Sequence, residues 1–140
     1  MPGDLFLDTA YAIALAARSD EHHELAVSLA KKLEADGTRL VTTPDVMVEI
    51  GNSLAKQSYR RAAVELLESL EQDPFVEIVP ASEELYQRAF ELFLGRPDKV
   101  WGLTDCVPFV VMQDLGLTAA LTTDEHFQQA GFQALLRPPP

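Results

Sequence analysis

Short apolar runs alternate with helix-like segments along this chain, and this alternation limits the possible folds more than any other feature. The runs lack a regular exchange of apolar and polar residues, which is typical of strands in a parallel sheet whose two faces are covered by helices. They are LFLD (5–8), RLVTT (39–43), FVEIVP (75–80), TAALTT (118–123) and FQALL (132–136). We therefore predict an α/β fold, a three-layer α/β/α domain around a central, mostly parallel sheet.

The segments between these runs have helical composition and recognisable ends. In residues 19–37 we expect Ser19 or Asp20 to cap a helix and Gly37 to end it. Further helices are predicted at 9–19, 58–72, 82–95 and 124–131.

Proline fixes the expected start of two more helices. Thr43 is placed to cap a helix over 43–57, with Pro44 at its first position, where the missing N–H does no harm. Pro108 is tolerable only near a helix start, so the helix after the loop 96–103 is expected to begin at Thr104 or Asp105.

Length and charge limit the function classes. With 140 residues and 47% hydrophobic content, the chain is expected to form one domain over residues 1–140, with a proline-rich tail at 136–140. A net charge of -11 argues against broad attraction to nucleic acid or an anionic membrane, although a local basic patch or a metal could still serve a polyanion.

The compartment is inferred from the cysteine and from the apolar runs. A single cysteine, Cys106, excludes an internal disulfide and a cysteine-cage zinc site, which fits the reducing cytoplasm. The run at 5–17 lacks a positive charge before it and is interrupted by Asp8, so it is not expected to be a signal peptide. No other apolar run approaches the roughly 20 residues that cross a bilayer, and no membrane contact is expected.

Four acids follow or flank the predicted strands. Asp8 and Asp124 stand at the carboxyl ends of strands, Asp105 begins a helix, and Glu49 lies little more than one turn into the helix after the second strand. In parallel sheets, ligands bind beyond the carboxyl ends of the strands. We therefore predict that Asp8, Glu49, Asp105 and Asp124 converge on one mouth.

Converging carboxylates repel one another unless some are protonated or a cation lies among them. Oxygen ligands without a cluster of histidine or cysteine favour Mg²⁺ or Mn²⁺ over Zn²⁺. Such an ion can lower the pKa of water, hold a phosphate oxygen and stabilise the leaving oxygen, so the pattern indicates metal-dependent phosphodiester hydrolysis.

Each acid also has an ordinary structural interpretation. Asp105 could be a first-turn acid that favours the helix dipole, Asp124 could cap the last helix, and Glu49 could be exposed on a helix surface. Asp8 is harder to explain in this way, because no capping box or nearby basic residue accounts for it. The four together favour a site, since all map to the same end of the sheet.

Four blocks, in the order LFLDTAYAIAL, VTTPDVMVEIGNSL, WGLTDCVPFVVM and ALTTDEHF, resemble the PIN domain. The resemblance runs from residue 5 to about residue 132 and is greatest to the VapC-like ribonuclease toxins of prokaryotic type II toxin–antitoxin modules. It implies an α/β nuclease that uses Mg²⁺ or Mn²⁺ to cut RNA, leaving 5′-phosphate and 3′-hydroxyl ends. It also implies a homodimer and an antitoxin that blocks the acidic pocket, and it assigns metal binding to Asp8, Glu49, Asp105 and Asp124.

Hydroxyl residues beside the acids also match the family pattern. Thr9 and Thr123 resemble small hydroxyl residues that hold the acids or a water. Gly102 stands where a serine is frequent and Pro108 where a small polar residue is frequent, and Thr104 is the expected source of the missing hydroxyl.

Basic and histidine residues allow two interpretations. Arg60, Arg61 and Lys99 could hold an RNA backbone or simply be surface charge, and Trp101 is expected in the core. The adjacent histidines at positions 22 and 23 cannot both face one metal, so they are assigned to a solvated helix start. His126 is assigned a surface role, and Cys106 is expected to be a buried small side chain.

Three functions remain open at this point. The leading hypothesis is a metal-dependent endoribonuclease. The second is a phosphatase with Asp8 as covalent nucleophile, a class that needs a second acid where this chain has Ala10. The third is a non-catalytic protein that keeps the fold to bind a partner or RNA.

Overall fold

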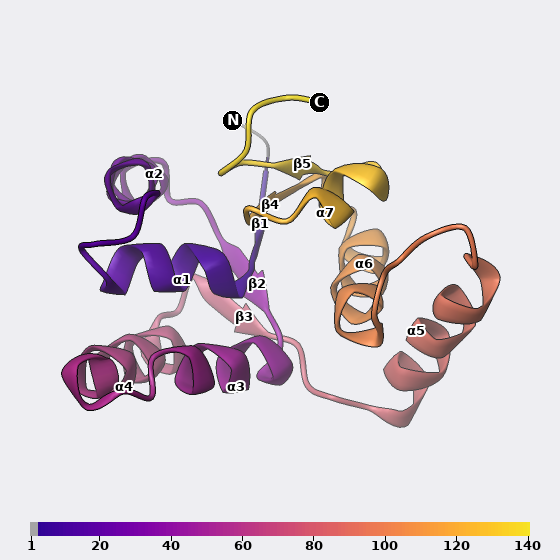
Figure 1. The fold of residues 1–140 in the computed structure, drawn as a ribbon, viewed down its shortest axis with the longest axis horizontal. Coiled ribbons are helices and arrows are strands. Elements are labelled where there is room, and N and C mark those ends of the chain that lie inside the picture. The colour runs from indigo at the N-terminus through magenta and orange to yellow at the C-terminus, as the bar shows by residue number, and fades with distance from the viewer. Residues whose placement is uncertain (1–2) are drawn as a thin grey trace.

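The computed structural model describes residues 3–140, in which five parallel strands form one sheet in the order β3-β2-β1-β4-β5 (Figure 1). The strands are β1 (Leu5–Leu7), β2 (Leu40–Thr42), β3 (Val76–Ile78), β4 (Ala119–Leu121) and β5 (Gln133–Ala134). The predicted α/β class is confirmed, and the sheet is parallel throughout.

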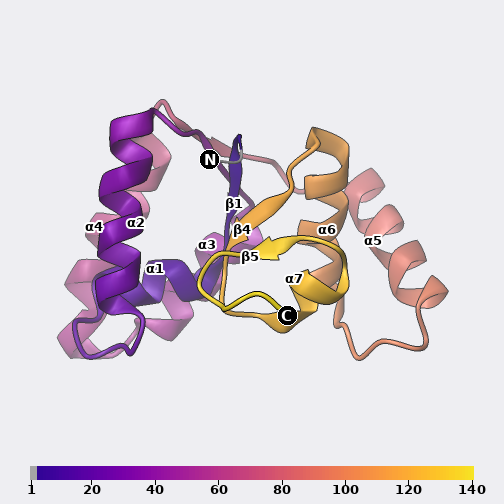
Figure 2. The ribbon, with the colours of Figure 1, turned by 90° about the horizontal axis from the view of Figure 1, so that it is seen from above.

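Helices cover both faces of this sheet, as Figures 1 and 2 show. On one side lie α1 (Thr9–Ala16), α2 (His23–Asp36), α3 (Pro44–Ser53) and α4 (Gln57–Gln72). On the other lie α5 (Glu83–Gly95), α6 (Leu103–Leu115) and the short α7 (Glu125–Gln129), with α5 outermost and packed on α6. The three-layer arrangement is therefore confirmed. No helix within residues 3–140 is both long and apolar enough to cross a membrane.

The start of α3 is as predicted, because the Thr43 hydroxyl accepts the N–H of Val46 at 3.3 Å and Pro44 is the first helical residue. The buried side chains of Val46 and Ile50 then set the rotation of the helix about its axis.

Two other predicted helix starts were wrong. The helix α2 begins at His23, because the Asp20 carboxylate accepts the N–H of His22 at 2.8 Å in the turn before the helix and does not cap it. The helix α6 begins at Leu103, one residue earlier than predicted, because the Asp105 carboxylate accepts the N–H of Gly102 at 3.0 Å and makes that glycine the N-cap.

The core lies between the sheet and the helices on each side. Strands β1 and β4 are completely buried, and Phe109 of α6 meets Trp101 and Phe127 edge-on at centroid distances of 5.1 and 5.0 Å. The predictions of a core tryptophan and a buried Cys106 are confirmed. Leu136, the first residue of the proline-rich segment, is buried too and donates its N–H to the carbonyl of Thr122 at 3.1 Å.

Candidate active site and metal centre

The pairing of two central strands brings the first and last acids together. In the register of β1 and β4, Leu7 lies beside Leu121, so the residues that follow both strands leave the sheet at the same edge. The N–H of Asp8 donates to the carbonyl of Leu121 at 3.3 Å, and Asp8 is the N-cap residue of α1. Asp124 is the N-cap residue of α7, three residues beyond β4.

A cavity of about 490 Å³ opens at this edge and contains all the predicted acids. Its walls include apolar side chains from α1, α6 and α7, namely Ile13, Pro108 and Phe127. Its polar lining comprises Asp8, Thr9, Glu49, Thr104, Asp105, Thr123 and Asp124. The structure thus brings together the four acids and the three threonines that were selected from the sequence.

Asp8 is held by a buried hydroxyl. Thr122 is fully buried, donates to Oδ2 of Asp8 at 2.6 Å and accepts the N–H of Asp124 at 3.0 Å through the same oxygen. Burial raises the pKa of Asp8, and the nearby charges of Glu49 and Asp124 raise it further, while hydrogen bonds from Thr122 and the Thr9 backbone act in the opposite direction. The net increase means that the negative charge of Asp8 is not fully balanced by the protein.

Glu49 reaches the cavity from α3. The Thr9 hydroxyl donates to Oε2 of Glu49 at 2.7 Å, which joins the residue after Asp8 to the helix acid. Since Val46 and Ile50 are buried, Glu49 lies at the edge of the buried face of α3.

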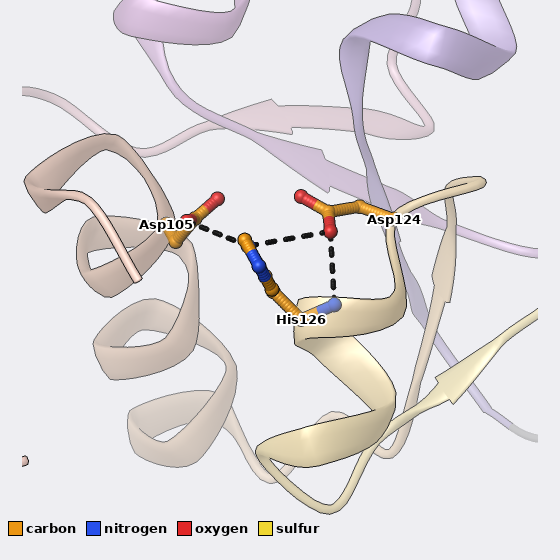
Figure 3. Close-up of side chains that lie close together, drawn as sticks. All are labelled: Asp105, Asp124 and His126. Atoms are coloured by element: carbon orange, nitrogen blue, oxygen red, sulfur yellow. Dashed lines mark hydrogen bonds and ion pairs between the residues drawn. The ribbon is translucent and has the colours of Figure 1, made fainter. Parts of the chain in front are cut away.

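Asp105 and Asp124 face each other across a histidine (Figure 3). The Nδ1 atom of His126 lies 3.0 Å from Oδ2 of Asp105 and 3.4 Å from Oδ1 of Asp124. Both acids also have the structural roles considered above, since Asp105 accepts the N–H of Gly102 and Asp124 that of His126, the latter at 2.8 Å. Each carboxylate uses one oxygen in these contacts, and its second oxygen remains for another partner.

Comparison of the chain with models of protein families identifies its family. The family model described as "PIN domain" matches residues 5–133, nearly the whole chain. The chain belongs to the PIN domain family.

A solved structure gives a finer comparison for this PIN domain. The crystal structure of Mycobacterium tuberculosis VapC20, described as a toxin that cleaves the sarcin–ricin loop, superposes with a TM-score of 0.78 at 25% sequence identity. The match covers 92% of this chain and 96% of that one, so the protein is a VapC-like PIN domain over its length. No curated protein sequence matches it.

The donor atoms of this PIN domain fit a hard divalent cation. Carboxylate oxygens dominate the cavity, and no lysine or arginine among residues 3–140 lines it to balance them. Oxygen donors of this kind are those that Mg²⁺ and Mn²⁺ prefer, and burial with the neighbouring charges of Glu49 and Asp124, which raises the pKa of Asp8, makes a cation at this carboxylate favourable.

Two residues near the acids have contacts that the sequence did not indicate. His126 was assigned a surface role, but its side chain is only 22% exposed and lies between two acids. Thr122, and not Thr123, supplies the hydroxyl that contacts Asp8, although Thr123 also lines the cavity. Alternation along an extended chain puts these two neighbouring side chains on opposite sides, but the sequence does not show which of them faces Asp8.

The basic residues of this PIN domain lie outside the cavity lining. Arg60 donates to the carbonyl of Ala55 at 2.8 Å, and Arg61 is a fully exposed partner of Glu65. Lys99 places its Nζ 6.0 Å from the centroid of the Trp101 ring. Their proposed role in holding RNA stays a prediction.

The other two histidines support the helices. His23 contacts the carbonyl of Ala14 through Nδ1 at 2.7 Å and so ties α2 to α1, whereas His22 lies beside Asp20 and Glu21. Of these two histidines, only His22 fits the predicted role at a solvated helix start.

Proposed function

We propose that this VapC-like PIN domain is a metal-dependent endoribonuclease that hydrolyses RNA phosphodiester bonds and acts as the toxin of a type II toxin–antitoxin pair. The observation that carries the proposal is the convergence of four carboxylates on one cavity, two from the N-cap residues of α1 and α7 and two from within α3 and α6. The similarity to VapC20, whose description names an RNA loop as its target, supports RNA as the substrate class.

Asp8, Glu49, Asp105 and Asp124 would hold Mg²⁺ or Mn²⁺. When bound, such an ion lowers the pKa of water, neutralises phosphate charge and stabilises the leaving oxygen. The chain contributes preorganisation, because each acid is already fixed by a neighbour before RNA arrives. Thr122 orients Asp8, Thr9 orients Glu49, and the helix caps orient the other two acids.

The remaining polar side chains of the lining are proposed to bind substrate or water. Thr104 and Thr123 both present to the cavity, next to Asp105 and Asp124 respectively. Arg60, Arg61 and Lys99 are proposed to contact the RNA backbone away from the acids, where phosphate charge needs a cationic partner.

A phosphatase mechanism with Asp8 as covalent nucleophile is less well supported. Such enzymes need a second acid two residues after the nucleophile, to donate a proton to the leaving group. Here that residue is Ala10, which itself lines the cavity. The place where the second acid would be needed is therefore occupied by a methyl group.

Protein partners are proposed as well: a cognate antitoxin and a second copy of the chain, within the cytoplasm. Large apolar side chains on the outermost helix support a protein contact, because α5 exposes Tyr86, Phe93 and Leu94 by 52%, 42% and 62%. Light scattering of the purified protein, alone and with its antitoxin, tests both associations. We further propose that residues 1–140 act as a single domain.

The test of the activity is incubation of purified protein with total RNA in Mg²⁺, in EDTA, and in EDTA followed by excess Mg²⁺. We expect cleavage in the first and third samples and none in the second. Asp8→Asn should abolish cleavage while retaining the wild-type circular dichroism spectrum, and the matched control Asp36→Asn, at the exposed end of α2, should cut like wild type. A folded Asp8→Asn protein with full activity would refute the assignment. Absence of cleavage in every sample, with RNA binding intact, would favour the non-catalytic alternative.

A further inference from the structure

We propose that His126 is a direct ligand of the divalent cation, through a ring nitrogen, beside Asp105 and Asp124. The inference rests on the proposed function and extends it, because the ligands considered so far are all carboxylates. It makes the metal centre a mixed nitrogen and oxygen site.

The spacing of the donor atoms carries the inference. One ligand atom from each of Asp105, Asp124 and His126 lies within 4.8 Å of the other two. An octahedral ion with bonds of about 2.1 Å keeps adjacent ligands about 3.0 Å apart and opposite ligands about 4.2 Å apart. The distances from Nδ1 to the two carboxylates, 3.0 and 3.4 Å, are close to that of adjacent ligands.

The local fold holds the imidazole in this position. The Asp124 carboxylate caps α7 by accepting the N–H of His126, so the acid and the histidine backbone form one fixed turn. The next residue, Phe127, is 1% exposed and packs edge-on against Phe109 of α6. This packing anchors α7 against the helix that carries Asp105. The imidazole ring of His126 lies between Asp105 and Asp124 (Figure 3).

The contacts of His126 are compatible with exchange for a metal. Without an ion, Nδ1–H donates to the Asp105 carboxylate; with an ion bound, Nδ1 offers its lone pair and the ring proton resides on Nε2. The side chain is 22% exposed, so Nε2–H can be hydrated without entering the core.

A nitrogen ligand changes which metals bind best. Carboxylates and water suit Mg²⁺ and Mn²⁺ alike, whereas imidazole favours transition metals. Its affinity for them increases in the order Mn²⁺, Fe²⁺, Co²⁺. His126 should therefore give the site a preference for Mn²⁺ over Mg²⁺ that four carboxylates alone would not provide.

Pulsed electron paramagnetic resonance of Mn²⁺ bound to the full-length protein tests the coordination directly. We expect electron spin echo modulation from one directly bound ¹⁴N, replaced by the ¹⁵N pattern when the protein carries ¹⁵N-histidine. Because labelling changes no atom's size or charge, this measurement does not depend on how a variant folds.

Calorimetric titration with MnCl₂ and with MgCl₂ provides the second readout. His126→Gln should weaken Mn²⁺ binding by about tenfold or more, the scale of losing a partner at a metal site, and Mg²⁺ binding by less. His22→Gln is the matched control, since His22 also stands beside two carboxylates, at 3.7 and 3.9 Å, but outside the cavity. Its affinities and its nitrogen signal should equal those of wild type.

The outcomes separate this inference from the function on which it rests. In one outcome, Mn²⁺ binds to the wild type and is lost in Asp124→Asn, but the bound ion shows no nitrogen modulation. That result would overturn the role of His126 and leave the nuclease proposal standing. No Mn²⁺ binding to the wild-type protein would overturn both. A nitrogen signal that persists in folded His126→Gln would also refute the assignment.

Discussion

The hydroxyl of Thr122 donates a 2.6 Å hydrogen bond to Asp8 and accepts the N–H of Asp124, so one buried side chain joins the first and last of the four acids of the site. It lies just beyond β4, where that strand runs beside β1. The positions of both acids therefore depend on the pairing of two strands that are distant in the sequence.

Replacing Thr122 with valine should impair both stability and catalysis. Valine keeps the shape but removes the donor to the half-buried Asp8 carboxylate, and a lost hydrogen bond to a charged group costs about 1.5–3 kcal/mol. Urea unfolding and RNA cleavage measure the two effects. Thr123→Val, one residue away, is the control for stability and should unfold nearly like wild type; equal losses of stability in both variants would contradict the specific role of Thr122.

Replacing Asp8 with asparagine should stabilise the metal-free protein at neutral pH. Burial, together with the charges of Glu49 and Asp124, raises the pKa of Asp8 above its value in the unfolded chain. The folded state thus binds this proton more tightly, and the resulting stability is fully present below the unfolded pKa and is lost as the pH rises through the folded pKa. A tenfold change in proton affinity corresponds to about 1.4 kcal/mol.

Urea unfolding in EDTA between pH 3 and pH 8 measures this effect. The wild-type protein should lose stability relative to Asp8→Asn as the pH rises above the ordinary aspartate pKa of about 4. With Mn²⁺ in place of EDTA, the wild type should gain stability and the variant should gain less. If Asp8→Asn is less stable than wild type in EDTA at pH 7.5, folding does not raise the pKa of Asp8.

The cap of α3 should matter for Glu49 as well as for stability. Thr43→Ala removes the acceptor for the N–H of Val46 and should cost about 1 kcal/mol, with some loss of cleavage because α3 carries Glu49. Ser82→Ala removes the equivalent cap from α5, where the hydroxyl accepts the N–H of Leu85 at 3.0 Å.

The two cap variants form a matched pair for thermal unfolding and cleavage assays. Both should lower the melting temperature, but only Thr43→Ala should lower the cleavage rate, because no residue of α5 lines the acidic cavity. Full activity of Thr43→Ala would show that the start of α3 does not position Glu49.

The exposed arginines should contribute to RNA binding through charge alone. Arg60→Glu with Arg61→Glu should weaken binding of an RNA substrate and reduce its dependence on salt, by about 0.7 in the log–log slope for each lost phosphate contact. Fluorescence anisotropy at several salt concentrations measures the slope. The matched control replaces Lys31 and Lys32, two adjacent exposed lysines of α2, with glutamate and so reverses the same amount of charge. An unchanged slope in the arginine variant would remove Arg60 and Arg61 from the binding surface.

Much of this site could be predicted from the sequence because local signals coincide with the ends of elements. Asp8 follows a buried strand directly, and Thr43 with Pro44 defines the start of the helix that carries Glu49. Once the sheet is taken as parallel, these positions share one edge, and no tertiary information is needed to place them there.

The contacts between acids and their neighbours could not be predicted in the same way. Which of two adjacent threonines reaches Asp8 depends on the side of the chain that each occupies after β4, and a shift of one residue exchanges them. His126 belongs to a helix of only five residues, too short for a periodic pattern to show its orientation. The position of its ring depends on the packing of Phe127 against α6, which is a tertiary contact.

The chemical ends of the cleaved RNA show whether carboxylates at the edge of this sheet hold a cation for the attack of water on phosphorus. Purified protein and RNA are incubated with Mg²⁺, and the new ends are sequenced after treatment that distinguishes phosphate from hydroxyl. We expect 5′-phosphate and 3′-hydroxyl ends that disappear in EDTA and in Asp8→Asn. Ends with a 2′,3′-cyclic phosphate, or cleavage that persists in EDTA, would contradict this role of the carboxylates, because attack by the ribose hydroxyl does not need this site.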